Sequence, residues 1–387
     1  MGVLSRIRFA KPSRVCAQEV EHSAPSFIRG QGSWLWSEEG RAYLDFYQGA
    51  AANSLGHSPE VLVNTLNAQA QAVLHTGYPS RPAHALAERL CQATGSDQAY
   101  LFNSGSDACE AAIRLARRWG LRYRNGAGGI ITARHGCHGR HLTAHDRTEV
   151  PFNDLPALHA AVDSRTVAIM LEPIQGAAGV IPASELYLKG VERLCRELGI
   201  LLILDEVQTG MGRCGALLAE QTYGVRADIL AVGKGLGGGL PMGAVLARGK
   251  ACCLEPADLG FSHQGNALMS MAGLAVLNAI LAPGLLAQVA DSGRYLRDGL
   301  VRLAHRHGQG IVRGQGLLWG LQLSDDGAQA LVKAARQEGL LLSAPQADCL
   351  RFTPALNVSK GNIDDMLLRL ARAFARVRTA QLQARKH

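Results

Sequence analysis

Six short apolar runs recur through the middle of this 387-residue chain, separated by helix-like segments or loops. They are AYLF (99–102), GIITA (129–133), TVAIML (166–171), ILLILD (200–205), DILAVG (228–233) and GAVLA (243–247). Runs that are apolar on both faces are typical of buried strands in a mainly parallel sheet. They therefore predict an α/β fold, with a mainly parallel sheet and flanking helices in a large domain.

The two ends of the chain differ from its middle. From about Ala267 the sequence has long helical stretches, then two or three strands around GLLWGLQL and LRFTPAL, and a final helix. This order predicts a smaller α+β domain, and SWLWSEEGRAYLDF near the start predicts a hairpin. We expect residues 1–48 to pack with the small domain, residues 49–262 to form the large domain, and residues 263–387 to form the small domain.

The net charge of +8, from 40 basic and 32 acidic residues, is not gathered in one block with interleaved aromatics. This favours a small anionic substrate and cofactor over nucleic acid. The basic start (Arg6, Arg8, Lys11, Arg14) leaves an organelle transit peptide as an alternative. Nine cysteines without a C-x-x-C pair indicate a reducing cytoplasm, and no apolar stretch reaches the ~20 residues that cross a bilayer. We expect a cytoplasmic protein with no membrane partner.

The segment LFNSGSDACEAAIRLARRW joins an apolar run to a helix through a tight Ser-Gly-Ser turn. Ser106 is a good N-cap in this segment. The free backbone N–H groups of Gly105, Ser106 and Asp107, together with the helix dipole, favour a bound phosphate. An ordinary capped helix is the alternative that this segment alone leaves open.

Two further runs end on groups suited to catalysis. ILLILD ends on Asp205, with Glu206 next, and ligands bind at the carboxyl ends of strands in an open α/β sheet. A carboxylate there can hold a metal, a ribose hydroxyl or a protonated ring nitrogen, or serve as a salt bridge or helix cap. Lys234 follows DILAVG within a glycine-rich turn, where burial would make its amine a nucleophile for Schiff-base chemistry.

The glycines around Lys234 do not fit a nucleotide-binding loop. A Walker loop needs GxxxxGK[ST], but this chain has Asp228 at the first position and Gly235 at the last. A GxGxxG string does occur from Gly233, yet a dinucleotide loop must open a helix, and here Pro241 and the strand-like GAVLA follow. These mismatches favour the nucleophilic amine.

Three lower-specificity features complete the candidate site. HGCHGRH (135–141) has plausible metal ligands, but one short loop without a second ligand pair gives weak support, so we expect no metal. Arg140 in that loop is better placed to hold a substrate carboxylate in bidentate fashion. Ser262 in GFSHQGN is a candidate phosphate contact and Arg351 in LRFTPAL a second carboxylate clamp, with structural roles as alternatives.

Taken in order, several segments resemble blocks of the class III pyridoxal-phosphate-dependent aminotransferases, from about Trp36 to Val358. They are NSLGHSPEV, NSGSDACEAAIRLAR, CHGR, LEPIQG, ILLILDEVQTGMGR, ADILAVGKGLGGG and QGN, and acetylornithine aminotransferases are the most similar subgroup. The resemblance implies a fold type I PLP-dependent transferase with pyridoxal 5'-phosphate as cofactor. It also implies amino-acid and 2-oxo-acid substrates, and a homodimer with active sites at its interface.

The resemblance further implies a role for each motif residue. Lys234 would bond the cofactor as a Schiff base and later move the α-proton, and Asp205 would keep the pyridinium nitrogen protonated. Arg140 would hold the substrate α-carboxylate, and Arg351 a carboxylate of glutamate or 2-oxoglutarate. The other implied contacts are Gln208 at the phenolic oxygen, Gly105 and Ser106 at the phosphate, Ser262 at the neighbouring subunit's phosphate, Cys137, Glu206 and Val207 at the cofactor, and Phe261 at the substrate.

Three positions depart from the family pattern. Cys137 stands where an aromatic usually stacks on the pyridine ring, Phe261 replaces a polar residue, and Ala177 replaces the acid that usually ends EPIQGE. Without that acid Arg351 stays free, which favours donors that present an α-carboxylate to Arg351 over δ-amino donors such as ornithine or acetylornithine. N-acetylornithine remains the best candidate donor, in arginine or related metabolism. The alternatives are another amino donor, a racemase, epimerase or decarboxylase on the same site, and a non-catalytic binding protein.

Overall fold

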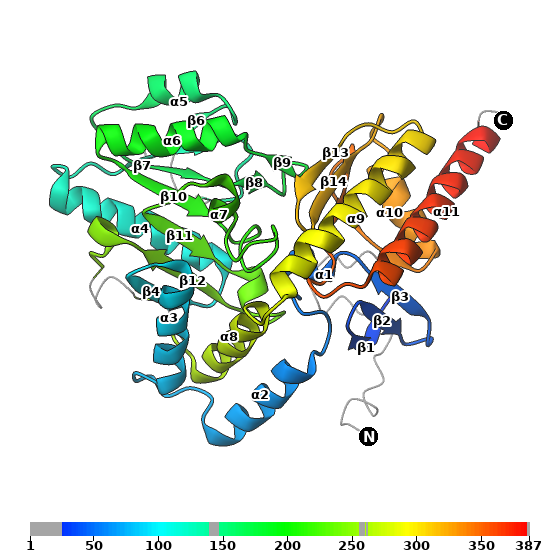
Figure 1. The fold of residues 1–387 in the computed structure, drawn as a ribbon, viewed down its shortest axis with the longest axis horizontal. Coiled ribbons are helices and arrows are strands. Elements are labelled where there is room, and N and C mark those ends of the chain that lie inside the picture. Colours follow the sequence, from blue (N-terminus) through cyan, green and yellow to red (C-terminus); the bar gives the residue numbers. More distant parts are fainter. Residues whose placement is uncertain (1–24, 139–146, 255–259, 261, 385–387) are drawn as a thin grey trace, which may run out of the picture.

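A seven-stranded sheet forms the centre of the larger part of the molecule (Figure 1). The computed structural model describes residues 25–138, 147–254, 260 and 262–384. The strands of this sheet are β4 (Gln98–Phe102), β5 (Gly129–Ala133), β6 (Arg147–Val150), β7 (Thr166–Leu171), β10 (Leu201–Asp205), β11 (Ile229–Val232) and β12 (Gly243–Ala247). Their order is β4-β12-β11-β10-β7-β5-β6, and only β12 is antiparallel to its neighbours. The mainly parallel α/β fold is thus confirmed.

All six predicted runs form strands, whereas the edge strand β6 was not expected. Its sequence RTEV is polar and mostly exposed, because β6 pairs on one side only, with β5. An edge strand of this kind carries no apolar run, and so the pattern that identifies buried strands does not detect it.

Helices cover both faces of the sheet. In β10, Leu202 and Leu204 face one apolar core, and Leu201 and Ile203 face the other. The helices and short turns of this part are α2 (Glu60–Ala72), α3 (Arg81–Thr94), α4 (Gly105–Tyr123), α5 (Leu155–Ala161), α6 (Glu185–Leu198), α7 (Ala219–Tyr223), η2 (Lys234–Leu236), η3 (Gly249–Ala251) and α8 (Ala267–Ile280). Helix α4 packs in the second core, and α3, α6 and α8 in the first.

The C-terminal part is a smaller α+β unit, as expected. It contains α9 (Leu285–Arg306), β13 (Val312–Gln315), β14 (Leu318–Gln322), α10 (Ala328–Gln337), β15 (Leu340–Leu341), β16 (Ser343–Gln346), β17 (Cys349–Phe352) and α11 (Lys360–Ala384). Strands β13-β14-β17-β16 form an antiparallel sheet. Helix α10 was not expected, because three of its four buried residues are alanines and only Leu331 is large.

The N-terminal strands join this C-terminal unit. They are β1 (Phe27–Gln31), β2 (Trp34–Ser37) and β3 (Ala42–Asp45), followed by the turn α1 (Gln48–Ala51), and a further hairpin joins β8 (Ile174–Gln175) to β9 (Ile181–Pro182). The predicted β2–β3 hairpin is present, and β15 pairs in parallel with β3. Because α8 packs against α2 and α3, we propose that the boundary between the large and small domains follows α8 instead of residue 262.

In the described ranges no single helix is long and apolar enough to span a bilayer. Only α8 and α9 taken together reach the required length and composition, and they are bent by 70° at the break between them.

Candidate active site

The predicted site residues meet at the carboxyl edge of the large sheet. Asp205 ends β10, Glu172 follows β7 and Lys234 follows β11 after Gly233. The turn at Ser104 follows β4, which runs in the same direction as β11 because both are antiparallel to β12. Ligands of open α/β sheets bind at this edge.

Asp205 lies at the bottom of the site, and three groups donate hydrogen bonds to its carboxylate. Its Oδ2 accepts from His138 Nδ1 at 3.1 Å and from the Cys109 thiol at 3.3 Å, and its Oδ1 accepts from the Val207 N–H at 3.0 Å. Burial alone would raise the pKa of Asp205. The hydrogen bond from His138 and its charge, followed by smaller effects of the Val207 N–H and Lys234, outweigh burial and hold the pKa of Asp205 below its ordinary value. Asp205 is therefore an anion.

Lys234 sits in a desolvated turn close to these acids. Its backbone adopts the left-handed region, with φ of 41°, which orients the side chain at the start of the short helical turn η2. Burial lowers the pKa of Lys234, and the charge of Arg351 lowers it further, while Asp205, Glu172 and Cys137 oppose the shift. A buried amine with a lowered pKa is a nucleophile near neutral pH.

Glycines bring the Ser104–Gly105 turn against the lysine strand. A Cβ on Gly233 would lie 2.9 Å from the Gly105 Cα, and one on Gly243 would lie 2.1 Å from the Ser104 carbonyl oxygen. On its other side Gly105 packs against Val207, whose Cγ1 would be 2.4 Å from a Cβ at Gly105. These glycines therefore permit a close approach of the two backbone segments. This packing gives a reason for the glycines around Lys234, which fit no nucleotide-binding motif.

The structure corrects the predicted cap of α4. The N-cap is Ser104, whose Oγ accepts from the Asp107 N–H at 3.1 Å, and Ser106 lies inside the first turn. Serine fits the N-cap rule at either position, and the extended backbone of Ser104 (φ −152°, ψ 163°) decides between them. Since Asp107 N–H is used for capping, Gly105 and Ser106 are the predicted N–H donors that remain for a phosphate.

The side chains of Gln208 and Glu206 contact different parts of the structure, although the two residues lie in the same loop. Gln208 lies against Gly176, where a Cβ would come within 1.6 Å of its Oε1, and its Nε2 donates to the Ala50 carbonyl at 3.4 Å. The Glu206 carboxylate instead accepts from Thr209 Oγ1 at 2.7 Å and from two backbone N–H groups at the start of α7, at 2.9 and 2.7 Å. Those donors account for Glu206, so its side chain does not support the predicted cofactor contact.

Arg351 projects from β17 toward the same site. Its Nε donates to Ser343 Oγ at 3.2 Å, and its Nη1 donates to the Gly176 carbonyl at 3.3 Å, next to Ala177. Burial lowers the pKa of Arg351, and the groups whose charges oppose this are Tyr47, Cys349 and Cys137. Among the described residues no carboxylate pairs with this guanidinium.

A fully buried arginine fixes β17 relative to the loop that follows β10. Arg213 Nη1 donates to the carbonyls of Leu317 at 3.0 Å and Pro354 at 2.5 Å, from two segments of the C-terminal unit. Burial lowers its pKa to about 10. The loop carrying Asp205 is thereby tied to the strand carrying Arg351.

The remaining predicted residues lie at the rim or outside the described ranges. Cys137 is exposed, and its backbone N–H donates to Glu172 Oε1 at 2.8 Å. The carbonyl of Ser262 accepts from Asn103 Nδ2 at 2.6 Å, beside the Ser104 turn of the same chain. Arg140 and Phe261 lie outside the described residues. Neither does the described part of the chain contain a cluster of three or more His, Cys, Asp or Glu side chains that could hold a metal.

Three residues at the site were missed from the sequence: Cys109, His138 and Glu172. In the sequence, Cys109 looks like one more apolar position in the buried stripe of α4. His138 lies in the HGCHGRH loop, where only Arg140 and a possible metal site were considered. Glu172 directly follows β7, just as Asp205 ends β10. That position at a strand end was the signal that could have found it.

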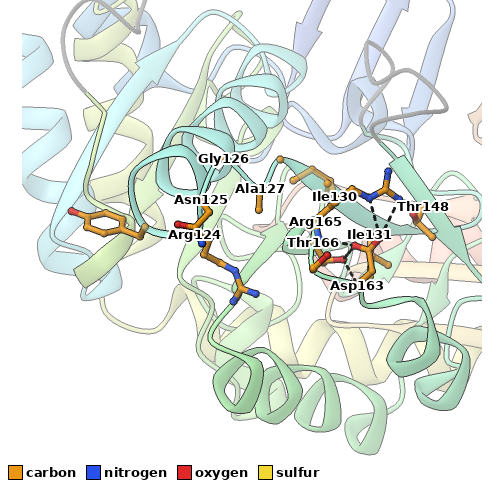
Figure 2. A pocket seen from close by; sticks show the side chains of 14 residues that line it. Arg124, Asn125, Gly126, Ala127, Ile130, Ile131, Thr148, Asp163, Arg165 and Thr166 are labelled. Carbon is orange, nitrogen blue, oxygen red and sulfur yellow. Dashed lines mark hydrogen bonds and ion pairs between the residues drawn. The ribbon is translucent and has the colours of Figure 1, made fainter.

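A surface pocket in the described part of the chain lies apart from this site. It has a volume of about 800 Å³ and is lined by residues that include Arg124, Gly129, Asp163 and Thr166. Figure 2 shows Asp163 bonded to Arg165 and Thr166 within it. Gly129 and Thr166 begin β5 and β7, so the pocket opens at the amino edge of the sheet, opposite Asp205.

Comparisons with known proteins agree on one family. A family model described as aminotransferase class-III matches residues 15–149 and 142–374. Acetylornithine aminotransferase 2 from Bordetella parapertussis is 44% identical over 374 residues, covering 91% of this chain and 94% of that protein. Acetylornithine aminotransferase from Ralstonia nicotianae is 41% identical over 367 residues, covering 88% and 92% respectively.

A solved structure gives the same result for the fold. The N-acetylornithine aminotransferase from Stenotrophomonas maltophilia K279a superposes with a TM-score of 0.85 at 36% identity. The alignment covers 92% of this chain and 97% of that one. The likeness therefore spans both the sheet that holds Lys234 and the unit that holds Arg351.

Proposed function

Because this chain belongs to the class-III aminotransferase family, we propose that it moves the amino group of N-acetylornithine to 2-oxoglutarate in arginine biosynthesis. It is a pyridoxal-phosphate-dependent transferase. The observation that carries the assignment is the meeting of Lys234 and anionic Asp205 at the carboxyl edge of the sheet, within electrostatic range of Arg351. The names of the relatives support the choice of donor.

The residues at this edge fit pyridoxal phosphate. A desolvated lysine suits the aldehyde, and a buried carboxylate held as an anion suits a protonated pyridine nitrogen. The turn at Gly105 and Ser106 begins a 19-residue helix, which suits the phosphate. Val207 packs on Gly105 between the turn and Asp205, where it would support one face of the ring.

Each residue then has a distinct task. Bound pyridoxal phosphate supplies an electron sink for the negative charge left when the substrate α-proton is removed. Lys234 would accept that proton at Nζ, because burial lowers its pKa and so favours the neutral amine. Asp205 keeps the ring nitrogen protonated, and Arg351 holds a substrate carboxylate through its guanidinium. Gln208, whose side chain packs against Gly176, would donate to the cofactor's phenolic oxygen.

The close packing of Gly243 on Ser104 predicts that Gly243→Ala weakens cofactor binding. The added methyl meets a backbone oxygen at 2.1 Å, so the phosphate turn must move. We expect the dissociation constant for pyridoxal phosphate, measured by equilibrium dialysis, to rise roughly 10-fold, equivalent to one charge-assisted hydrogen bond. Gly128→Ala is the control, since its methyl would meet nothing closer than 3.7 Å. Equal affinities for the two variants would contradict the role of the turn.

The donor assignment is tested by comparing amino donors with 2-oxoglutarate as acceptor. Acetylornithine, ornithine, 4-aminobutyrate and several α-amino acids would be compared by kcat/KM. The proposal expects acetylornithine to give the largest value. A larger value for an α-amino acid would leave the aminotransferase chemistry intact and overturn the donor.

One observation favours a second candidate, an aminotransferase for α-amino donors. Ala177 offers no acid to Arg351, and Gln346 Nε2 donates to its backbone carbonyl at 2.9 Å. The positive charge of Arg351 therefore stays available to every donor, including those that present an α-carboxylate to it beside the reacting amine. This property disfavours a δ-amino donor, whose neutral or basic end would face that charge.

Ala177→Glu separates the two candidates. A carboxylate at this position would neutralise Arg351 while a δ-amino donor binds, so the turnover of acetylornithine relative to α-amino acids should rise. We expect a change of about 5- to 10-fold, the factor for ~1 kcal/mol. Ala177→Gln, similar in size but neutral, should leave the ratio as it is in the native protein. An unchanged ratio in the glutamate variant would remove the charge explanation.

We also propose a cytoplasmic homodimer. Helix α2 and the loop after it expose the large apolar side chains Val61 (44%), Val63 (40%), Leu74 (53%) and Tyr78 (82%) to solvent, and a partner chain would bury this apolar surface. Tyr78 and His263 line one pocket, and His263 directly follows Ser262 in the sequence. A partner chain that covers this pocket would therefore lie close to Ser262. None of the eight cysteines in the described ranges forms a disulfide, which suits a reducing compartment.

The dimer is tested by light scattering of the native protein and of Tyr78→Glu. We expect two chains per particle for the native protein. A charge buried at the centre of the interface should give single chains with much reduced turnover. A native protein that elutes as one chain while fully active would refute a shared active site.

A further inference from the structure

A pocket in the C-terminal unit lies between the end of α9 and the C-terminal half of α11, two helices that pack side by side (Figure 1). Its volume is about 540 Å³, and α10 and the loops that precede β13 and α10 complete its lining. Among the described residues that line it, none belongs to the proposed active site. The proposed amino transfer therefore gives this pocket no role.

Two arginines from different helices meet at this pocket. Arg306 ends α9 and Arg378 lies in α11, and both side chains are exposed. Burial lowers the pKa of the adjacent His307, and the charges of both arginines lower it further, so both guanidinium groups lie near one imidazole. Within the described ranges neither arginine has a hydrogen bond or an ion pair. Two cations without a protein partner thus stand at one cavity.

The other charges of the pocket do not explain this arrangement. Asp325 also lines it, but its Oδ1 accepts from the Gly327 N–H at 3.1 Å. Two arginines and one aspartate leave the lining with a net charge of +1. The dipole of α9 favours a cation at Arg306, in the last turn of that helix. It does not account for Arg378, which lies before the last turn of α11.

The rest of the lining is largely apolar. The ring of His307 stacks on that of Phe374, with centroids 4.7 Å apart and planes at 19°. Leu331 of α10 is buried and Leu382 of α11 is 52% exposed, so apolar surface continues from the core to the mouth of the pocket. The Nε2 atom of His307 is buried and has no partner within the described ranges. Buried polar atoms normally have one.

We propose that this pocket binds a small organic anion. Its carboxylate or phosphate group would lie between Arg306 and Arg378, and its apolar body would pack against Phe374 and Leu382. Guanidinium groups bind both kinds of head group in bidentate fashion. A cavity of this size, with apolar walls and a few converging polar groups, is typical of small-molecule sites. The site is separate from Lys234, so the proposal does not depend on the chemistry there.

The test measures binding of 1-naphthyl phosphate to the cofactor-loaded protein by equilibrium dialysis. It is made in about 0.15 M salt, where exposed charges more than about 8 Å apart are largely screened. We expect saturable binding with a dissociation constant on the order of 1 mM. Inorganic phosphate and 1-naphthol, which each lack one half of the probe, should bind more weakly. A parallel titration with 1-naphthylacetate shows whether phosphate or carboxylate is the preferred head group.

Three variants locate the probe. Arg306→Gln and Arg378→Gln should each raise its dissociation constant about 3- to 5-fold, the factor for one exposed charge pair. Leu382→Ser should raise it about 3-fold, because a half-exposed leucine contributes only part of its apolar surface. All three side chains are exposed, so the melting temperature of each variant should stay close to that of the native protein.

Arg372→Gln and Leu368→Ser are the matched controls. Arg372 is another exposed arginine of α11, and Leu368 is a leucine of the same helix with 51% exposure. Neither lines the pocket, and both variants should keep the native affinity. Equal affinities in Arg306→Gln, Arg378→Gln and Arg372→Gln would place the probe elsewhere and overturn the inference. The absence of saturable binding to the native protein would overturn it as well.

Discussion

Lys234→Ala is expected to abolish turnover, with a loss in kcat of at least ~10⁴-fold. Two contributions disappear together: the covalent link that presents the cofactor to substrate, and the base that moves the α-proton, which alone is worth about 10² to 10⁴ in rate. The lysine is suited to both tasks because burial lowers its pKa, which favours the neutral amine. The amine is in place before substrate arrives, since the turn η2 and Gly233 fix its backbone.

Lys250→Ala is the control for a general effect of removing a lysine. Lys250 is exposed, lies over the ring of Trp119 at 5.2 Å, and donates to the Ile200 carbonyl just before β10, at the amino edge of the sheet. Its loss should leave kcat within about 2-fold of the native value, in line with surface substitutions elsewhere. Circular dichroism of both variants checks that each is folded. Substantial turnover by a folded Lys234→Ala would refute the assignment of this residue.

Glu220→Gln is expected to destabilise the protein by about 3 to 5 kcal/mol, the range for leaving one charge of a buried pair without its partner. Glu220 and Arg248 are 3% and 6% exposed and form a bidentate pair at 2.6 and 3.0 Å. Arg248 also donates to the carbonyls of Thr94 and Ala227, so one guanidinium joins the end of α3 to the segment before β11. The measurement is the free energy of unfolding in urea.

Glu185→Gln serves as the surface comparison. Its ion pair with Lys189, at 2.5 Å, is solvent-exposed, and such pairs contribute ~0.5 kcal/mol or less. Replacing both buried partners, as in Glu220→Met with Arg248→Leu, should recover most of the stability lost by the single variant, because no unpaired charge is left. A single variant as stable as the native protein would show that the buried pair does not hold these segments together.

Much of the fold could be predicted because the large sheet is buried on both faces. β7, with six buried residues of six, and β10, with five of five, leave no other interpretation for their apolar runs. β6 escaped prediction because an exposed edge strand needs no apolar residues. The same physics explains α10, whose small buried alanines contribute little to a periodic pattern.

The candidate site was predictable where chemistry follows from position along the chain. Asp205 ends β10 and Lys234 comes shortly after β11, and these positions alone bring the two residues to one edge of the sheet. Cys109 and His138 were not predictable, since their roles depend on contacts across 96 and 67 residues of sequence. The Glu206 carboxylate, next in sequence to Asp205, accepts from two backbone N–H groups at the start of α7, a partner that its position at the strand end does not reveal.

The central claim is that this protein exchanges amino groups through a cofactor at Lys234. Its most direct test is a single half-reaction, in which acetylornithine is added to the cofactor-loaded enzyme without any 2-oxo acid. The account predicts that each subunit converts its cofactor once to the amine form, releases one equivalent of the aldehyde product, and recovers its original spectrum on addition of 2-oxoglutarate. A cofactor that stays in its aldehyde-derived form while the donor is racemised or decarboxylated would contradict it.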